Sequence, residues 1–403
     1  MSYGKSLGLA IGLTLVIAFV VGCGGVPAAA PVSEALATPP PTQTASLESA
    51  EVTKIETAIE NTMKKLQLPG LAIGIIKDRQ VVYSKGFGLA EVGTERLVTP
   101  QSVFQLGSVS KMMVGIAIMQ LKEQGKIDLD APVITYLPYF RLADERYKEI
   151  TIRHLLSHRA GLPFNVRSVD YTYPADYQSP EYDEGALERH VRSLTSVRLQ
   201  SAPGAQMQYS DLGFEILGDV IAKVSGQSFE AYTQDHIFTP LGMQHTTFLV
   251  RDIPPELLAA PHVLQGSNIV VNSYFPYSRQ HAPSSHLFSN VEDMSRYALA
   301  QLNRGQLGET RILPAAAYEE MWAPQGDAEA LSQWEQKVGL GWFIGDQEGH
   351  RLVGHGGGDI GFGCGFIMAP DDGLAVVVMV NRDYQAEVFS YLVVMKSLLE
   401  TKE

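Results

Sequence analysis

Strand-like segments stand near both ends of the globular part of this chain, with a long helical stretch between them. Residues 71–88 are apolar or alternating around an Asp-Arg turn, a pattern typical of a β-hairpin. Three further strand-like segments lie close to the carboxyl-terminal end: 339–344, 361–368 and 374–380. The middle, from about 150 to 330, combines helical patterns with loops rich in Pro, Tyr and Ser. This order is typical of a sheet that the chain leaves and then rejoins.

Helices are expected on either side of the strands. Apolar residues recur at helical spacing from Val52 to Leu66, and the pair at 69–70, Pro-Gly, ends that pattern. Further helices are expected over these segments: 112–124, 212–224 and about 386–399. The sequence therefore predicts an α+β fold, in which an antiparallel sheet is flanked by helices and an all-helical lobe is inserted at about 150–330.

Composition narrows the class of protein. With 403 residues, the chain is long enough to bury a large core. A formal net charge of −13 without a cluster of Lys and Arg is not typical of a nucleic-acid-binding protein, so no nucleic-acid partner is expected. The two cysteines are Cys23 and Cys364. A domain of this size needs no disulfide, even outside the cell.

The first residues have the pattern of an export signal. Lys5 precedes an uncharged apolar run over 7–21, which is short for a membrane span. The stretch 20–23, Val-Val-Gly-Cys, resembles a bacterial lipobox, in which the cysteine (Cys23) becomes lipidated. We therefore expect a lipoprotein signal peptide at 1–22, with an ordinary cleaved signal as the alternative. The expected location is the cell envelope, on the periplasmic or extracellular face of a membrane.

A tether is expected to follow the signal peptide. Residues 23–46 are rich in Pro and Ala, a composition that predicts a disordered segment. A lipid on Cys23 would anchor the chain to a membrane, and the tether would hold the folded domain, expected over 47–403, away from that surface.

A serine and a lysine stand three residues apart at the start of the expected helix 112–124. Because residues i and i+3 share one face of a helix, the amine of Lys111 can lie beside the hydroxyl of Ser108. A serine needs a neighbouring base to act as a nucleophile, and a lysine whose pKa is lowered by burial can be that base. The alternative is a serine that caps the helix and a lysine exposed to solvent.

Two further motifs carry chemistry downstream. Tyr-Ser-Asp at 209–211 stands at the entrance of a helix, and His-Gly-Gly-Gly at 355–358 precedes a strand. Together with the S-x-x-K segment at 104–111, these motifs, in this order, resemble the serine β-lactamase and penicillin-binding-protein superfamily. The branch that they resemble is related to class C β-lactamases and also contains esterases and D-amino-acid peptidases. The resemblance extends from about residue 50 to the end of the chain.

The resemblance implies a β-lactamase/DD-peptidase-like fold and a serine hydrolase that works through an acyl-enzyme. It implies Ser108 as the acylated nucleophile, Lys111 and Tyr209 as its proton partners, and His355 as the group that orients the substrate or proton donor. The backbone N–H groups of Ser108 and Gly358 would form the oxyanion hole. The expected substrate is a small molecule or short peptide with an ester, a β-lactam or a D-amino-acid peptide bond. No metal or organic cofactor is implied.

Asp211 departs from the asparagine that is usual in the Y-x-N motif of this branch. An ionised carboxylate cannot donate a hydrogen bond. It can instead pair with Lys111 and hold it charged, which favours Tyr209 over Lys111 as the base. Asp211 is therefore expected to orient its neighbours, and it can also cap the helix that follows.

Other interpretations fit the chain less well. The HGGG sequence at 355–358 also occurs in α/β-hydrolases, but the G-x-S-x-G that they need occurs only at 4–8, inside the expected signal peptide. His154 and His158 have the spacing of a metal pair, but leucine follows the first histidine where a zincin has glutamate. Cys364 lies in an alternating segment typical of packing.

One functional alternative remains open. A penicillin-binding or sensor protein would be acylated at Ser108 without turnover. A scaffold without chemistry is a third hypothesis, and the presence of Ser108, Lys111 and Tyr209 together argues against it.

Overall fold

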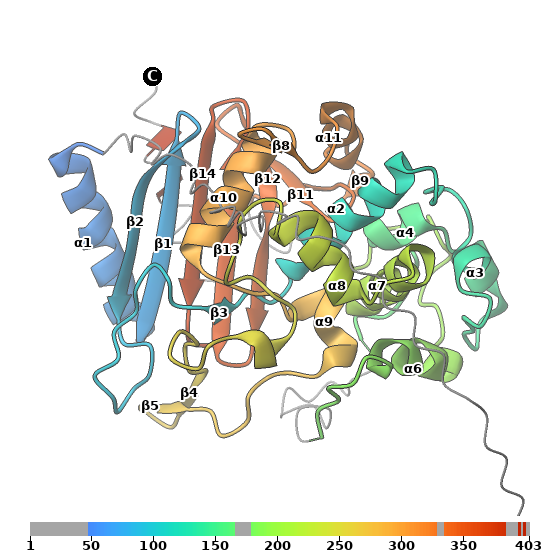
Figure 1. Cartoon of the computed structure of the whole chain (residues 1–403), viewed down its shortest axis with the longest axis horizontal. Helices are drawn as coiled ribbons and strands as arrows, with labels where there is room; N and C mark the ends of the chain where they lie inside the picture. Colours follow the sequence, from blue (N-terminus) through green and yellow to red (C-terminus); the bar gives the residue numbers. More distant parts are fainter. Residues whose placement is uncertain (1–46, 166–178, 329–333, 384–393, 396–397, 400–403) are drawn as a thin grey trace, which may run out of the picture. The chain divides into compact units, whose positions relative to one another are not determined.

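An antiparallel sheet joins the two ends of the domain (Figure 1). Strand β14 (Leu374–Val380) pairs with β1 (Gly70–Lys77), so that Val378 lies opposite Ile73. The other strands are β2 (Gln80–Gly88), β9 (Gly326–Asp327), β10 (Lys337–Val338), β11 (Phe343–Gln347), β12 (His350–Asp359) and β13 (Phe362–Ala369). In the described part of the chain the order is β2-β1-β14-β13-β12-β11-β10-β9, with every pairing antiparallel. The predicted fold class is confirmed.

The computed structural model describes five stretches of the chain: 47–165, 179–328, 334–383, 394–395 and 398–399. All of them lie in the compact unit Thr44–Glu403. The expected signal peptide, the expected tether with Cys23 and most of the expected helix at 386–399 fall outside these stretches. None of the described helices is both long and apolar enough to span a bilayer.

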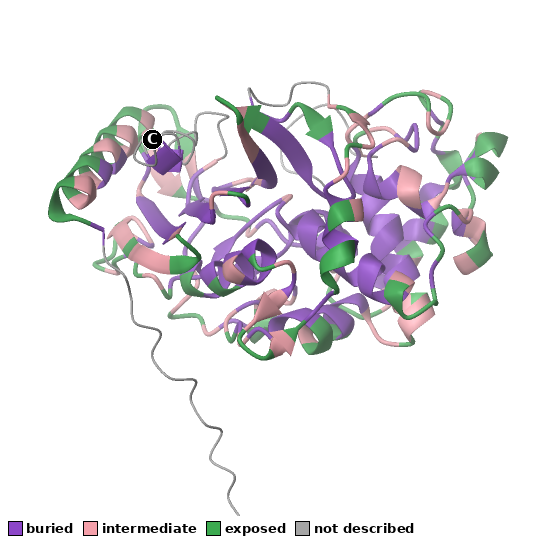
Figure 2. Cartoon of the chain, turned by 90° about the horizontal axis from the view of Figure 1, so that it is seen from above, coloured by how far each residue is buried: buried purple, intermediate pink, exposed green. Residues whose placement is uncertain are grey.

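The side chains of β1 alternate between two helical layers. Ile73 packs in the core beneath α1 (Ser49–Leu66), whose outer side is exposed at the left of Figure 2. The next residue, Gly74, faces α10 (Val291–Leu302) on the opposite side of the sheet. A Cβ at Gly74 would stand 2.7 Å from the hydroxyl oxygen of Ser295, so glycine permits this close packing.

The inserted segment is mainly helical. Between β2 and β9 the chain also forms α2 (Ser110–Glu123), α3 (Val133–Tyr136), α4 (Ile152–Leu156), α6 (Ala186–Ser193), α7 (Asp211–Ser225), α8 (Phe229–Thr233), α9 (Ala282–Ser285) and α11 (Ala315–Met321). Short strand pairs form there too, so the segment 150–330 is not all-helical: β4 (His262–Gln265) pairs with β5 (Asn268–Val271), and β7 (Gln306–Leu307) with β8 (Thr310–Arg311). Glycines with positive φ, Gly266 and Gly308, make these tight turns possible.

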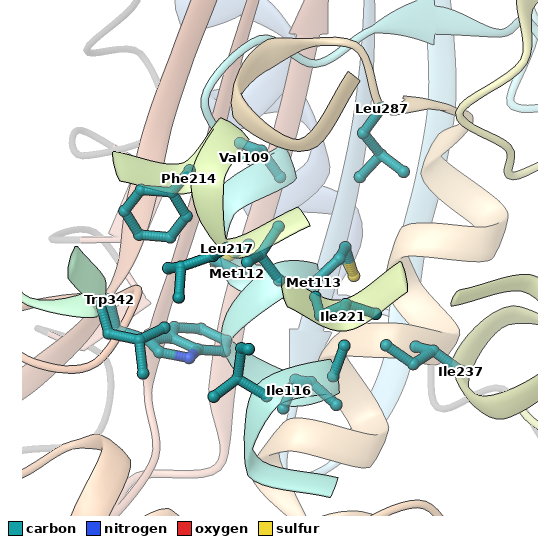
Figure 3. Close-up of a cluster of buried hydrophobic side chains, with 14 of the residues drawn as sticks. Val109, Met112, Met113, Ile116, Phe214, Leu217, Ile221, Ile237, Leu287 and Trp342 are labelled. Atoms are coloured by element: carbon teal, nitrogen blue, oxygen red, sulfur yellow. The ribbon is translucent and has the colours of Figure 1, made fainter. Parts of the chain in front are cut away.

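Helix α2 is buried on all sides. Every residue from Ser110 to Leu121 is buried, which is typical of a helix at the centre of a large core. Figure 3 shows side chains around its first turns that come from several segments of the chain: Val109, Met112, Met113, Ile116, Phe214, Leu217, Ile221, Ile237, Leu287 and Trp342. Lys111 belongs to this buried stretch, so its charge needs partners inside the protein.

The strand expected at 339–344 is wrong in its bounds. Strand β10 ends at Val338 and β11 begins at Phe343. The residues between them form a turn that is closed by a hydrogen bond from the Gly339 N–H to the Trp342 carbonyl, 2.7 Å long. Gly341 has a φ of 81°, which interrupts an extended chain. Alternating apolar residues indicated a strand here, and the glycines made it a hairpin instead.

Strand β12 passes close to the turn that leads into α2. A Cβ on Gly357 would stand 2.0 Å from the Leu106 carbonyl oxygen and 3.0 Å from the Ser108 amide nitrogen. From the other side, a Cβ on Gly107 would stand 2.3 Å from the Gly358 amide nitrogen. The glycines of the HGGG motif therefore let two backbones meet beside Ser108.

We predict that Gly357→Ala disrupts this meeting of backbones. The added methyl group has no flexible neighbour to displace, so the free energy of unfolding should fall by about 1–3 kcal/mol. Urea unfolding of wild type and variant measures the loss. Gly213→Ala is the matched control, because a Cβ there meets its nearest neighbours at an ordinary 3.6 Å. Equal stability of Gly357→Ala and wild type would contradict the close contact.

Candidate active site

Ser108 lies in a turn that a distant segment, residues 286–289, holds in place. Strand β3 (Phe104–Gln105) pairs with β6 (Phe288–Ser289), and Gly107 forms a bridge with His286 just beyond. The Lys111 N–H then donates to the Ser108 carbonyl at 3.0 Å, as the first turn of α2 begins. The nucleophile candidate thus stands at the amino-terminal end of a buried helix, where the sequence predicts it and where the helix dipole favours negative charge.

Ser110, the second serine of the motif, has a structural task. Its hydroxyl donates to the Gly107 carbonyl at 2.6 Å and accepts from the Leu287 N–H at 2.9 Å. These contacts tie the turn before α2 to the residues after α9. The hydroxyl of Ser108 is the one that remains for chemistry.

Lys111 is fully buried and uses three hydrogen-bond donors. Its Nζ donates to the Ser108 hydroxyl oxygen at 2.9 Å, to Asp211 Oδ1 at 2.8 Å and to the Ser284 carbonyl at 2.7 Å. An ammonium group has three N–H donors, so these acceptors saturate it. In this protonated form the lysine has no lone pair to accept the Ser108 proton.

The charge of Lys111 follows from the same contacts. Burial by itself lowers the pKa of this ammonium, as the sequence suggests, but the neighbouring Asp211 carboxylate, together with Tyr209, outweighs burial and raises the pKa above its usual range. Lys111 is therefore charged at neutral pH. This agrees with the pairing expected from Asp211 and disfavours Lys111 as the resting base.

Tyr209 is partly buried in a stack of aromatic rings. Its ring centroid lies 4.3 Å from that of His158 and 5.8 Å from that of Phe164, and Lys111 Nζ lies 4.9 Å from the same ring. Burial raises the pKa of the phenol, and Lys111 lowers it by a smaller amount. The expectation that the lysine favours the phenolate is right in direction, but burial outweighs it. Tyr209 is therefore a neutral phenol at rest, and its phenolate would be a strong base.

His355 is a buried, neutral imidazole on β12. Its Nδ1 donates to the Gly356 carbonyl, while Nε2 is buried and has no partner among the described residues. Burial and the charge of Lys111 lower the pKa of His355 to about 3. The charge of this histidine therefore does not change near neutral pH, contrary to the expectation from an isolated imidazole. With Nδ1 protonated, Nε2 is an acceptor.

The two backbone segments that are expected to form the oxyanion hole lie against each other. Gly358 follows Gly357 on β12, where that strand presses against the turn of Ser108. The amides of Ser108 and Gly358 thus stand on two facing backbones. Donors fixed in this way need no reorganisation when a tetrahedral oxyanion forms.

The sequence did not place two groups that lie near the site. The Ser284 carbonyl binds Lys111, but any residue can supply a carbonyl, so no sequence pattern marks it. His158 accepts a hydrogen bond from the Ser210 N–H at 3.1 Å and stacks on Tyr209. His154 instead accepts from the Thr151 N–H, so each histidine of the suspected metal pair has a backbone partner of its own.

Cys364 lies in β13 away from water. Burial raises the pKa of its thiol, which opposes formation of a nucleophilic thiolate. The residue pairs across the sheet with Gly357 and Met379. Its surroundings fit the packing role expected from the sequence.

The comparison with known families agrees with these observations. Residues 55–393 match the family model described as Beta-lactamase, which is most of the chain. This match confirms the superfamily resemblance that the three motifs indicate.

Curated proteins of similar sequence exist. Protein flp of Staphylococcus aureus (strain MW2) is 27% identical over 329 residues, which are 81% of this chain and 62% of that protein. The putative penicillin-binding protein PbpX of Bacillus subtilis (strain 168) is 27% identical over 266 residues, 66% of this chain and 61% of that protein. The chain thus spans about three-fifths of the length of these relatives.

Solved structures share the fold. The octameric penicillin-binding protein homologue from Pyrococcus abyssi has a TM-score of 0.75 and 27% identity, over 87% of this chain and 77% of that chain. The structure described as SurE has a TM-score of 0.70 at 24% identity, over 88% of this chain and 76% of that chain. The second likeness supports the fold alone.

We predict that neutral, buried His355 makes stability depend on pH. Between pH 6.5 and about 3 the unfolded chain protonates this histidine and the folded chain does not. Stability should therefore fall as pH falls, by about 1.4 kcal/mol per pH unit from this residue. His355→Gln should give a flatter profile in urea unfolding from pH 7 to 5.

The exposed His236 supplies the control for this measurement. His236→Gln should keep the wild-type dependence of stability on pH. An unchanged dependence in His355→Gln would contradict the assignment of a neutral, buried imidazole.

Proposed function

Because the chain belongs to the β-lactamase family, we propose that it is a serine hydrolase that works through an acyl-enzyme. The observation that carries the proposal is the contact of Lys111 Nζ with the Ser108 hydroxyl, 2.9 Å long, at the end of a buried helix. A saturated ammonium beside this hydroxyl orients it and favours negative charge on its oxygen. The substrate is a carbonyl compound that can transfer its acyl group.

Tyr209 is the proposed base. Its phenolate is a minor species at neutral pH, since burial raises the pKa, and Lys111 reduces the cost of forming it. As the Ser108 oxygen bonds to the substrate carbon, its proton passes to the phenolate. The amides of Ser108 and Gly358 hold the oxyanion. Tyr209 then returns the proton to the leaving group, and water releases the acyl group by the same steps in reverse.

An ester is the proposed first substrate class. His355 occupies the place of the lysine in the K-T-G motif of well-known superfamily members, and its neutral ring offers no cation to a substrate carboxylate. β-Lactams and D-alanyl peptides with a free carboxyl end carry that carboxylate. We also propose that Cys23 carries a lipid anchor, so that hydrolysis takes place at the cell envelope.

A second candidate is a penicillin-binding protein that is acylated without turnover. The names of two similar proteins favour it, since one is a putative penicillin-binding protein and the other a penicillin-binding protein homologue. Kinetics separates the two candidates. A hydrolase turns over continuously, whereas a sensor gives one equivalent of product and then stops.

We predict that Ser108→Ala abolishes acylation and that Tyr209→Phe lowers kcat by about 100- to 10,000-fold, since it removes the proposed base. Short nitrophenyl esters, a chromogenic cephalosporin and D-alanyl peptides form the substrate panel. Intact mass spectrometry locates the acyl group. Tyr136→Phe is the control, because its hydroxyl binds the Asp128 backbone outside the site.

The panel can reject the proposal. If the Ser108→Ala variant still hydrolyses every substrate of the wild type, Ser108 is excluded as the nucleophile. Faster turnover of the cephalosporin than of every ester would exclude the proposed preference for esters.

We predict that Asp211→Asn moves part of the base role to Lys111. Asparagine keeps an acceptor for Nζ but removes the charge that helps raise the lysine pKa. The loss caused by Tyr209→Phe should therefore be smaller in the Asp211→Asn background. A double-mutant cycle in kcat/KM between pH 7 and 9.5 measures the difference, and an identical loss in both backgrounds would show that the carboxylate does not set this division of roles.

A further inference from the structure

Helix α7 carries three acidic residues one turn apart, which places them on one face. Asp211 binds Lys111, and Asp219 accepts a hydrogen bond from the Tyr139 hydroxyl at 2.6 Å. Glu215 lies between them with 1% of its surface exposed. The proposed reaction gives this buried carboxylate no task, although burying it is costly unless it is paired.

Three donors from two segments converge on Glu215. His190 Nε2, from α6, lies 2.8 Å from Oε2. His281 Nδ1 lies 2.6 Å from Oε1. The Ser284 hydroxyl, which has one proton to donate, lies 3.1 Å from the same oxygen and 3.1 Å from the His281 carbonyl oxygen, so the two acceptors share it. Burial raises the pKa of Glu215, but the two histidines outweigh burial and hold it well below its usual range. The carboxylate is therefore ionised and keeps its three donors at neutral pH.

Ser284 links this cluster to the nucleophile. Its side chain binds Glu215, and its backbone carbonyl accepts the hydrogen bond from Lys111. The residue lies in α9, a single turn that its own helical hydrogen bonds hold weakly. Helix α9 is also pressed against α7, since a Cβ on Gly218 would stand 2.2 Å from a ring carbon of Pro283.

We propose that Glu215, clamped by His190 and His281, is a positioning residue that holds the Ser284 carbonyl against Lys111 and so fixes the ammonium beside Ser108. Among the described residues, Glu215 has hydrogen bonds to His190, His281 and Ser284 and none to Ser108. It acts along a chain of contacts from carboxylate to serine hydroxyl, from serine carbonyl to ammonium, and from ammonium to nucleophile. The inference rests on the proposed function, because it concerns the positioning of the same Lys111.

The cluster also has the residue types of a zinc site, with His190, Glu215 and His281 close together. The distances between the histidine nitrogens and the Glu215 oxygens are those of direct hydrogen bonds and not of ligands around a shared metal ion. A tetrahedral zinc ion places its ligand atoms about 3.4 Å apart, whereas the two nitrogen-to-oxygen contacts here are 2.8 and 2.6 Å. Metal analysis therefore belongs in the test.

The test compares Glu215→Gln with Asp219→Asn in the full chain. Both variants remove a buried carboxylate from the same face of α7, but of the two only Glu215 has a hydrogen bond to α9 in the described structure. Glu215→Gln should lower kcat for the best ester by about 10- to 100-fold with KM unchanged, because the ammonium shifts. Asp219→Asn should keep the wild-type kcat at a temperature where both variants are folded.

The dependence of kcat on pH supplies a second measurement, which should not change if Glu215 has a purely structural role. Loss of the Glu215 charge and of a fixed acceptor on Lys111 both favour the Tyr209 phenolate. The rise of kcat with pH should therefore begin at lower pH in Glu215→Gln than in wild type. Should that variant fail to fold, Ser284→Ala, which keeps the carbonyl but frees it from Glu215, should show a smaller loss of kcat in the same direction.

The outcomes separate this inference from the proposed function. A wild type that hydrolyses nothing in the panel overturns the proposed function. An active wild type with an equally active Glu215→Gln, or with Asp219→Asn impaired to the same degree, overturns the positioning role alone. One equivalent of zinc in purified wild type, lost in Glu215→Gln, also overturns it, since the cluster would then be a metal site.

Discussion

The buried ammonium of Lys111 is the group on which the arrangement of this site depends. Removing a charge from water costs several kcal/mol, and hydrogen bonds to three acceptors offset that cost. Each acceptor belongs to a different element: Ser108 to the turn before α2, Asp211 to α7 and Ser284 to α9. The three contacts therefore bring these elements to one point. The requirement that the buried ammonium be hydrogen-bonded therefore determines how these elements are arranged around Ser108.

The same charge sets the protonation of its surroundings. Burial, together with the nearby ammonium, keeps His158 and His355 neutral. For Tyr209 the two effects oppose each other, since burial favours the phenol and Lys111 favours the phenolate. The site thus combines a fixed cation, Lys111, with neutral rings. One of these rings, that of Tyr209, can accept a proton when it is in its phenolate form. This is the division of roles that a serine nucleophile needs.

Much of this was predictable from local sequence. The contact of Lys111 with Ser108 follows from their spacing on a helix. The pairing of Lys111 with Asp211 follows from carboxylate chemistry once the motifs are placed together. The carbonyl of Ser284 was not predictable, because a backbone carbonyl is the same in every residue. The bounds of the strand expected at 339–344 were missed because alternating apolar residues also occur around a glycine turn.

The sequence by itself determined the order of the main helices and strands, the residues of the candidate site and their grouping into three motifs. These depend on periodicity, on spacing and on residue chemistry, all of which are local. Only the tertiary structure decided which groups are charged, because a pKa depends on burial and on distances between residues far apart in the chain. Lys111 could have been a neutral base by its sequence alone. It is an ammonium because folding removes it from water and surrounds it with Asp211 and the Ser284 carbonyl.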